Sequence, residues 1–214
     1  MTAAKAEDNR GGASEPRSRP DPRPVPRPVL RPARPDDAAD MARLADLAGG
    51  GLPRHLWARQ AAPGEDALAV GARRAAREEG LFSWPNAVIA EVGGATAGML
   101  VTYRVADAPE PLDALPPMFR PLQSLENRVP GSLYVNMLAT YPAFRRQGVA
   151  WALLAEAERK GATARGLSLV VADDKTEARR LYRAFGFVEI AQEALVPEDW
   201  QTTSRAWVLM TKPR

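Results

Sequence analysis

The sequence contains no cysteine and a single histidine among its 214 residues. The absence of cysteine excludes disulfides, thiolate zinc sites, iron–sulfur clusters and any covalent mechanism through a cysteine thioester. No segment approaches the roughly 18 consecutive apolar residues of a membrane helix, and the N-terminus lacks the apolar core of a signal peptide. We therefore expect a cytoplasmic protein without a membrane partner.

Lysine is scarce as well, because four of the 29 basic residues are lysines and the other 25 are arginines. The formal net charge is +3, and residues 1–28 account for +2 of it with six basic and four acidic side chains. Residues 29–214 are therefore nearly neutral and lack the overall basic charge of a protein that tracks a phosphate backbone. We expect no nucleic acid partner.

Residues 1–28 also contain almost no apolar side chains, and six of them are prolines, most of which are interleaved with arginines. Such a stretch cannot bury enough surface to offset the entropy of ordering it, so we predict a disordered, partly polyproline-like tail. A docking arm for acidic or proline-binding partners is the functional alternative. Residues 29–214 are enough for one sizeable core and are predicted to form a single domain.

Within this domain, segments of strand and helix periodicity alternate. Strands are predicted at 29–33, 87–91, 97–103, 133–139, 167–172, 187–190 and 205–210. Helices are predicted after the acidic pair 36–37, less regularly over 52–80, and at 149–160 and 175–185. Residues 106–131 hold six prolines together with large apolar side chains, so we expect a packed cover there. This order predicts an α/β arrangement around one mixed sheet.

The segment 145–150 follows a predicted strand and opens a helix. Small residues at 148 and 150 allow the backbone to come close to a ligand, and the amides of the first helical turn have no partner within the helix. With Arg145 and Arg146, this helix start favours an anion. The glycine patterns of dinucleotide-binding and NTPase loops are absent. Taken alone, one glycine here also fits an ordinary turn.

A second segment begins with Asp174 and Glu177, whose spacing predicts a capping box at a helix start. Four apolar residues then form a single stripe at helical spacing, namely Ala178, Leu181, Tyr182 and Phe185. Gly186 is expected to end this helix. By periodicity alone, Tyr182 is an ordinary aromatic residue of the core.

Together the two segments resemble the GCN5-related N-acetyltransferase (GNAT) superfamily. The signature Q/R-x-x-G-x-G/A is matched by Arg145, Gly148 and Ala150, and the later family residues by Ala178, Leu181-Tyr182 and Gly186-Phe187. The resemblance extends over most of residues 29–212. It implies a mixed α/β, GNAT-like fold, with a central, mostly antiparallel sheet of six to seven strands and about four flanking helices. The fourth and fifth strands of such a sheet splay apart.

The resemblance also implies a binding site for acetyl-CoA as cosubstrate, without a metal. Its pantetheine would insert between the splayed strands and pair with the backbone of the fourth strand at Leu138, Ala139 and Thr140. Its pyrophosphate would lie, next to Arg145, on the amides of Arg146, Gln147, Gly148, Val149, Ala150 and Trp151. The family's usual asparagine is replaced by Lys175, which is long enough to reach a phosphate.

Catalytic roles follow from the same resemblance and from the chemistry of amines. Tyr182 matches the tyrosine that commonly protonates the departing thiolate. Some peptide-acetylating members carry a basic glutamate where this chain has Val170, which disfavours peptide acetylation by the same arrangement. An ammonium must lose a proton before it can attack a thioester, so a base is required. Glu126 is the principal candidate, and Asp173 is a second one.

Other side chains remain alternatives for parts of this task. Asn136 and Tyr134 could orient a water molecule, and His55 lies in the region that forms the acceptor side of such folds. The default explanation for each of them is a structural or merely exposed side chain. The tryptophans at 57, 84, 200 and 207 are expected in the core or in a pocket wall.

We expect an acyltransferase that moves acetyl from acetyl-CoA to a primary amine of a small molecule, or of a peptide, by direct attack in a ternary complex. One alternative is a catalytically silent CoA-binding sensor of the same fold. A second alternative is an interaction protein that binds a partner through its tail. The acceptor and the quaternary state stay open, with a homodimer among the alternatives.

Overall fold

The computed structural model describes residues 27–214, so nearly all of the predicted tail at 1–28 lies outside the described residues. Seven strands form one sheet in the order β1-β2-β3-β4-β5-β7-β6. Their bounds are β1 Val29–Pro32, β2 Ala87–Val92, β3 Ala95–Arg104, β4 Leu133–Thr140, β5 Leu167–Ala172, β6 Val188–Ala194 and β7 Ala206–Lys212. All neighbouring strands are antiparallel except β4 and β5. The predicted mixed, mostly antiparallel sheet is confirmed.

Six α-helices are present in residues 27–214, rather than about four. Their bounds are α1 Ala38–Ala48, α2 Leu52–Ala58, α3 Ala67–Ala75, α4 Arg120–Glu126, α5 Val149–Lys160 and α6 Thr176–Ala184. The irregular stretch 52–80 divides into α2 and α3 because the Asp66 side chain accepts a hydrogen bond from the Leu68 amide and caps a new helix. Helix α4 forms within the proline-rich cover, since Pro121 occupies its first turn, where a missing N–H costs nothing.

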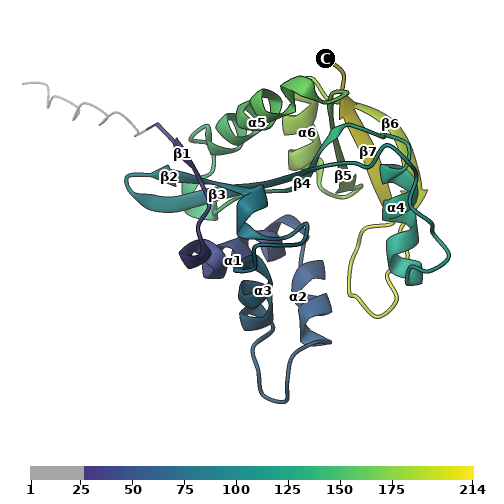
Figure 1. Cartoon of the computed structure of the whole chain (residues 1–214), viewed down its shortest axis with the longest axis horizontal. Coiled ribbons are helices and arrows are strands. Elements are labelled where there is room, and N and C mark those ends of the chain that lie inside the picture. Colours follow the sequence, from purple (N-terminus) through teal and green to yellow (C-terminus); the bar gives the residue numbers. More distant parts are fainter. Residues whose placement is uncertain (1–26) are drawn as a thin grey trace, which may run out of the picture.

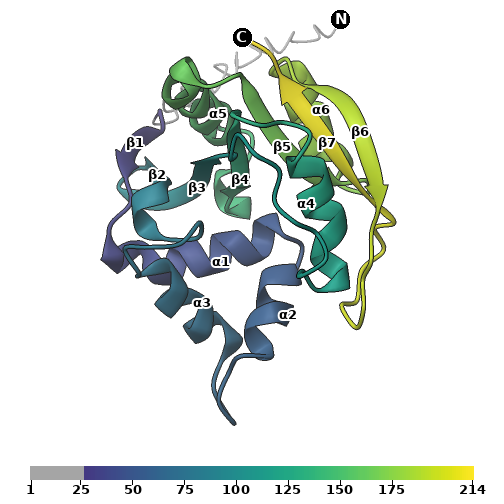
Figure 2. The same cartoon turned by 45° about the vertical axis from the view of Figure 1, so that its right-hand side comes forward.

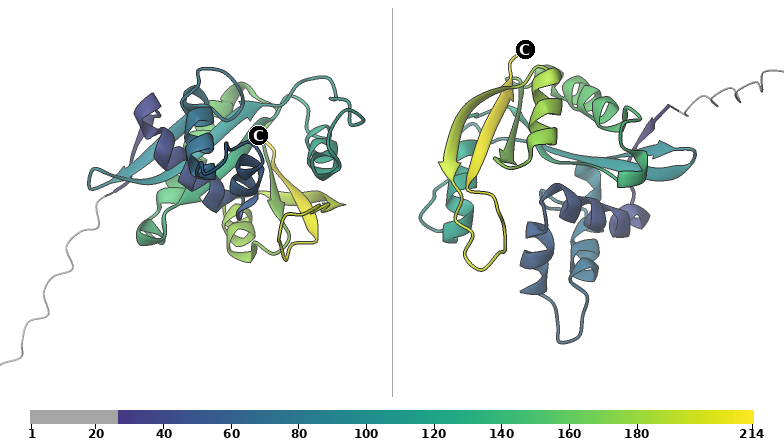
Figure 3. Two further views of the ribbon diagram at one scale, coloured as in Figure 1. Left: turned by 90° about the horizontal axis from the view of Figure 1, so that it is seen from below. Right: turned by 180° about the vertical axis from the view of Figure 1, so that it is seen from behind.

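The helices cover both faces of the sheet. Helices α5 and α6 lie on one face and α1, α2 and α3 on the other, as Figures 1 and 3 show. On the first face, Leu153 and Leu154 of α5 are fully buried against the sheet, and on the second face Met41 and Leu44 of α1 are fully buried. Helix α4 packs beside β6 and β7 (Figure 2). No helix in the described part of the chain is long and apolar enough to cross a membrane.

Strands β4 and β5 part soon after they meet. They pair only at Leu133 with Leu167 and at Tyr134 with Ser168, whereas β4 stays paired with β3 as far as Thr140. The register between β3 and β4 shifts so that Asn136 has no partner on β3, and such a bulge bends a strand. Strand β5 remains paired with β7 along its whole length. The predicted splay of the fourth and fifth strands is confirmed.

Candidate active site

A cavity of about 910 Å³ lies in the wedge between β4 and β5. Its lining includes twelve of the thirteen residues put forward above as the acid, the principal base or the cofactor-binding set. They are Glu126, Leu138, Ala139, Thr140, Arg145, Arg146, Gly148, Val149, Ala150, Trp151, Lys175 and Tyr182. The exception is Gln147, whose side-chain Nε2 donates a hydrogen bond to the Ala143 carbonyl 3.0 Å away. One cavity therefore joins the splayed strand, the start of α5 and both proposed proton-transfer groups.

The second half of β4 forms one wall of the wedge. Within the described residues, no strand pairs with the β5-facing edge of β4 after Tyr134. Backbone N–H and C=O groups at such an edge need partners, because a buried peptide group without one is costly. The hydroxyl of Thr140 is likewise buried without a hydrogen-bond partner. An extended ligand that carries amides can complete this edge in the manner of an added strand.

The start of α5 forms the second wall. Gly148 is the N-cap residue with φ 79°, and no side chain caps the helix. The first helical hydrogen bond runs from the Ala152 amide to the Gly148 carbonyl, which leaves the preceding amides without helical partners. A methyl group added at Gly148 would meet nothing within 4 Å. Open space above free amides, with Arg145 and Arg146 beside it, is suited to an anion.

The predicted capping box at the start of α6 is wrong. Lys175 is the N-cap residue without a side-chain bond, because Asp174 accepts hydrogen bonds from Ser204 at 2.7 Å and from Thr203 at 2.9 Å. The ammonium of Lys175 lies 3.6 Å from Asp174 Oδ1, and a methyl group added at Gly50 would lie 3.1 Å from it. Lys175 thus reaches across the cavity to the turn between α1 and α2.

Tyr182 lies on α6 with its side chain buried, and it lines the cavity. Its ring packs at 5.8 Å from that of Phe187, and within residues 27–214 its hydroxyl forms no hydrogen bond. Burial raises the pKa of Tyr182 to about 12. The hydroxyl therefore stays protonated near neutral pH and is free to donate a hydrogen bond to a ligand in the cavity.

Glu126 ends α4 and presents a mostly buried carboxylate to the same cavity. Burial raises the pKa of Glu126, while a hydrogen bond from the Tyr103 hydroxyl at 2.9 Å acts in the opposite direction. Burial also raises the pKa of Tyr134 well above its ordinary value, and the neighbouring charge of Glu126 adds to that effect. A carboxylate with a raised pKa is a better proton acceptor than an exposed one.

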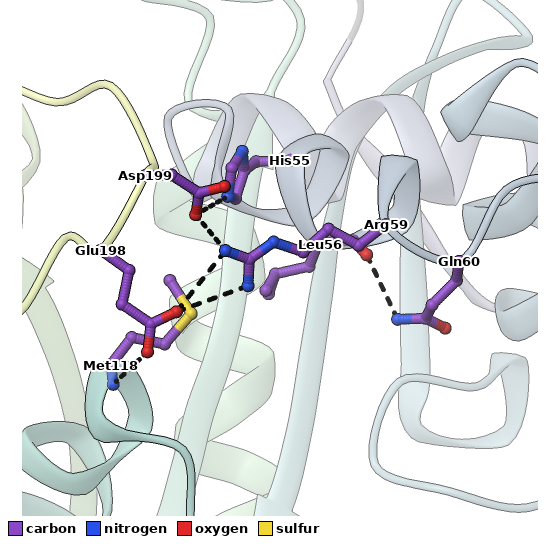
Figure 4. Close-up of polar contacts among 7 residues, drawn as sticks. All are labelled: His55, Leu56, Arg59, Gln60, Met118, Glu198 and Asp199. Atoms are coloured by element: carbon purple, nitrogen blue, oxygen red, sulfur yellow. Dashed lines mark hydrogen bonds and ion pairs between the residues drawn. The ribbon is translucent and has the colours of Figure 1, made fainter.

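The remaining candidates divide between the cavity and the surface. Asn136 and Tyr134 line the cavity, whereas Asp173 does not, because its carboxylate accepts a hydrogen bond from the Arg205 amide at 3.0 Å. His55 also lies outside the lining, with Nε2 3.2 Å from Asp199 (Figure 4). In the described part of the chain, no cluster of three or more His, Asp or Glu side chains is arranged to hold a metal ion.

Several lining residues were not identified from the sequence. They come from the end of α1, the start of α2, α4 and α6, and include Leu47, Ala48, Leu52, Pro53, Leu122 and Arg180. No local pattern separates a leucine that faces a cavity from one that faces the core, so no signal was present to find them. Trp200 and Trp207, expected in the core or a pocket wall, also line the cavity.

The comparisons with known proteins agree with this arrangement. The model of the acetyltransferase (GNAT) family matches residues 55–187. An N-acetyltransferase from Staphylococcus aureus Mu50 has a TM-score of 0.60 and 19% identity, over 86% of this chain and 99% of that one. Ard1 from Thermoplasma volcanium has a TM-score of 0.53 and 18% identity, over 87% and 99%. No curated protein matches in sequence.

The solved structures are too distant in sequence to show more than the fold. The family match is stronger, because it covers more than half of the chain and includes the start of α5, α6 and the wedge between β4 and β5. Those elements contribute most of the cavity lining, and they carry the motifs at Gly148 and Tyr182. The chain therefore belongs to the acetyltransferase (GNAT) family, whose common chemistry is acetyl transfer.

Proposed function

We propose that this protein transfers acetyl from acetyl-CoA to a primary amine of a small molecule or peptide, by direct attack in a ternary complex. The observation that carries the proposal is the single cavity that connects the unpaired edge of β4, the open start of α5, Tyr182 and Glu126. Acetyl-CoA supplies an activated acetyl thioester. The chain has no cysteine, so an acetyl-cysteine intermediate is excluded, and direct transfer requires both substrates to be bound together.

The residues of the wedge fit acetyl-CoA chemically. Successive residues of a strand direct their backbone groups to opposite sides, so within the stretch from Leu138 to Thr140 the groups that do not face β3 are open to the amides of its pantetheine arm. The free amides that precede Ala152, together with Arg145 and Arg146, would hold the pyrophosphate. Lys175 supplies a further positive charge at the same mouth of the cavity.

Two side chains then serve as proton acceptor and hydrogen-bond donor in the reaction. Glu126 would accept a proton from the acceptor ammonium, directly or through water held by Asn136 or Tyr134. Tyr182 would donate a hydrogen bond to the departing sulfur, since its hydroxyl is protonated and has no protein partner within the described residues.

The proposal is tested by initial rates of thiol release with acetyl-CoA and a panel of primary amines, with the product confirmed by mass spectrometry. Intersecting double-reciprocal lines are expected, because both substrates bind before chemistry. Parallel lines would indicate an acetylated enzyme and would contradict direct transfer. Tight binding of CoA without turnover of any amine would instead support the silent sensor.

Substitution of Gly148 by tryptophan is expected to weaken CoA binding by at least about 100-fold, or about 2.7 kcal/mol. The indole would fill the space that is open above the free amides of α5. Isothermal titration calorimetry measures the effect, and Gly148→Ala is the matched control. Both variants bear the strain of a side chain at φ 79°, but only the tryptophan blocks the site. Unchanged affinity in a folded tryptophan variant would place the pyrophosphate elsewhere.

A further inference from the structure

We propose that the acceptor is a compact primary amine on an apolar, flat body, with one ammonium facing Glu126 and its body against Trp200, Trp207 and Leu122. This inference rests on the proposed acetyl transfer and names its substrate class. The residues concerned come from α4, β7 and the loop between β6 and β7, and all of them line the cavity. Trp200, Trp207 and Leu122 also belong to one apolar cluster, in which Leu125 and Leu209 are fully buried.

The walls at this end of the cavity are aromatic and aliphatic. The indoles of Trp200 and Trp207 stack with ring centroids 6.2 Å apart and an interplanar angle of 7°. Leu52 and Leu122 pack against the same cluster from α2 and α4. Each Å² of apolar ligand surface buried here contributes about 25 cal/mol to the binding free energy, and an indole face also attracts a cation. These walls favour a flat apolar body.

The charge at this end suits a single ammonium. Three described carboxylates line the cavity, from Glu126, Asp174 and Glu177. Asp174 is already bound by Ser204, Thr203 and Lys175, and Glu177 stands in the first turn of α6 on the exposed surface. Glu126 is therefore the carboxylate available to an acceptor. A polyamine would place its further ammonium groups against apolar walls, which is costly for an unpaired charge.

Ionic contacts outside the cavity hold these walls together. Figure 4 shows Arg59, which directly follows α2, next to Glu198 and Asp199 of the loop between β6 and β7, and His55 of α2 next to Asp199. Glu198 also accepts a hydrogen bond from the Met118 amide, just before α4. The loop that carries Trp200 is thereby joined to both α2 and the segment before α4. These contacts restrain three elements around the acceptor end of the cavity, and we expect them to favour a short acceptor over a long peptide.

The test compares kcat/KM at saturating acetyl-CoA for 2-phenylethylamine, spermidine and a tetra-alanine peptide with a free N-terminus. We expect 2-phenylethylamine to exceed each of the others by at least tenfold. Calorimetric titration of the same amines into the enzyme–CoA complex should give the same order without requiring turnover. Equal or reversed preference in both measurements would overturn this inference and leave the proposed function standing. If none of the amines causes thiol release, the proposed function itself is overturned.

Substitutions of Trp200 and Leu122 test whether these apolar walls cause the preference for 2-phenylethylamine. Trp200→Ala should raise the KM for 2-phenylethylamine about tenfold, with a much smaller effect on kcat and on the KM for acetyl-CoA. Leu122→Ala, a milder change at a half-buried position, should act in the same direction and serves if the first variant does not fold. Trp84→Phe is the matched control, because Trp84 packs against the cluster around α1 and not along the cavity. An unchanged KM in both wall variants would contradict the assignment.

Discussion

Replacing Glu126 by glutamine is expected to lower kcat by about 10²- to 10⁴-fold, the range for loss of a general base. The same change should leave the melting temperature unchanged or raise it. Burial raises the pKa of Glu126, so its folded-state pKa lies above its unfolded value. Such a group stabilises the fold below the unfolded pKa, and that contribution is lost as the pH rises through the folded pKa. A neutral glutamine avoids this cost at pH 7 and still accepts the hydrogen bond from Tyr103.

The pH dependence gives an independent measurement of the same role. A base must be deprotonated, so kcat/KM should fall on the acid side with the pKa of Glu126. The hydrogen bond from Tyr103 lowers that pKa, and Tyr103→Phe should therefore move the acid limb to higher pH. Glu79→Gln is the control, since this exposed carboxylate lies outside the cavity. A glutamine variant at position 126 with near-normal kcat would assign proton removal to another group.

The features that were predicted correctly depend on neighbours close in sequence. The start of α5 follows from the small residues at 148 and 150, which act within one helical turn. The stripe that includes Tyr182 follows from helical periodicity, and α6 does present that side chain inward. The splay of β4 from β5 was predicted from the family resemblance, and the bulge that leaves Asn136 without a partner on β3 lies where the two strands part.

The features that were missed depend on residues distant in sequence. Asp174 has the spacing of a capping box, but Ser204 and Thr203 compete for its carboxylate from about thirty residues away. The acceptor walls combine α2, α4 and β7, and no single segment contains a pattern for that surface. His55 was a candidate because it is the single histidine and lies in the region that forms the acceptor side of such folds, whereas its partner, Asp199, is 144 positions away.

Replacing Tyr182 by phenylalanine is expected to lower kcat by about 10²- to 10³-fold, the usual cost of removing one donor to a developing negative charge. The ring and its packing on Phe187 are kept, and the hydroxyl has no described protein partner to lose. Stability should therefore change little. Tyr141→Phe is the matched control, because that hydroxyl bonds Asp40 at 2.7 Å outside the cavity. It should lose stability rather than activity.

The raised pKa of Tyr182 decides what kind of donor it is. Burial raises the pKa of Tyr182 to about 12, so this phenol is a weaker acid than an ordinary alkyl thiol, whose pKa is about 8.5, and full proton transfer to the thiolate is unfavourable. We therefore expect Tyr182 to stabilise the departing thiolate by a hydrogen bond and to release no proton to solvent below about pH 10. The wild-type kcat should then show no alkaline fall due to Tyr182 between about pH 8 and 10. A fall in that range that disappears in Tyr182→Phe would show instead a phenol acidified by the bound substrates and acting as a true general acid.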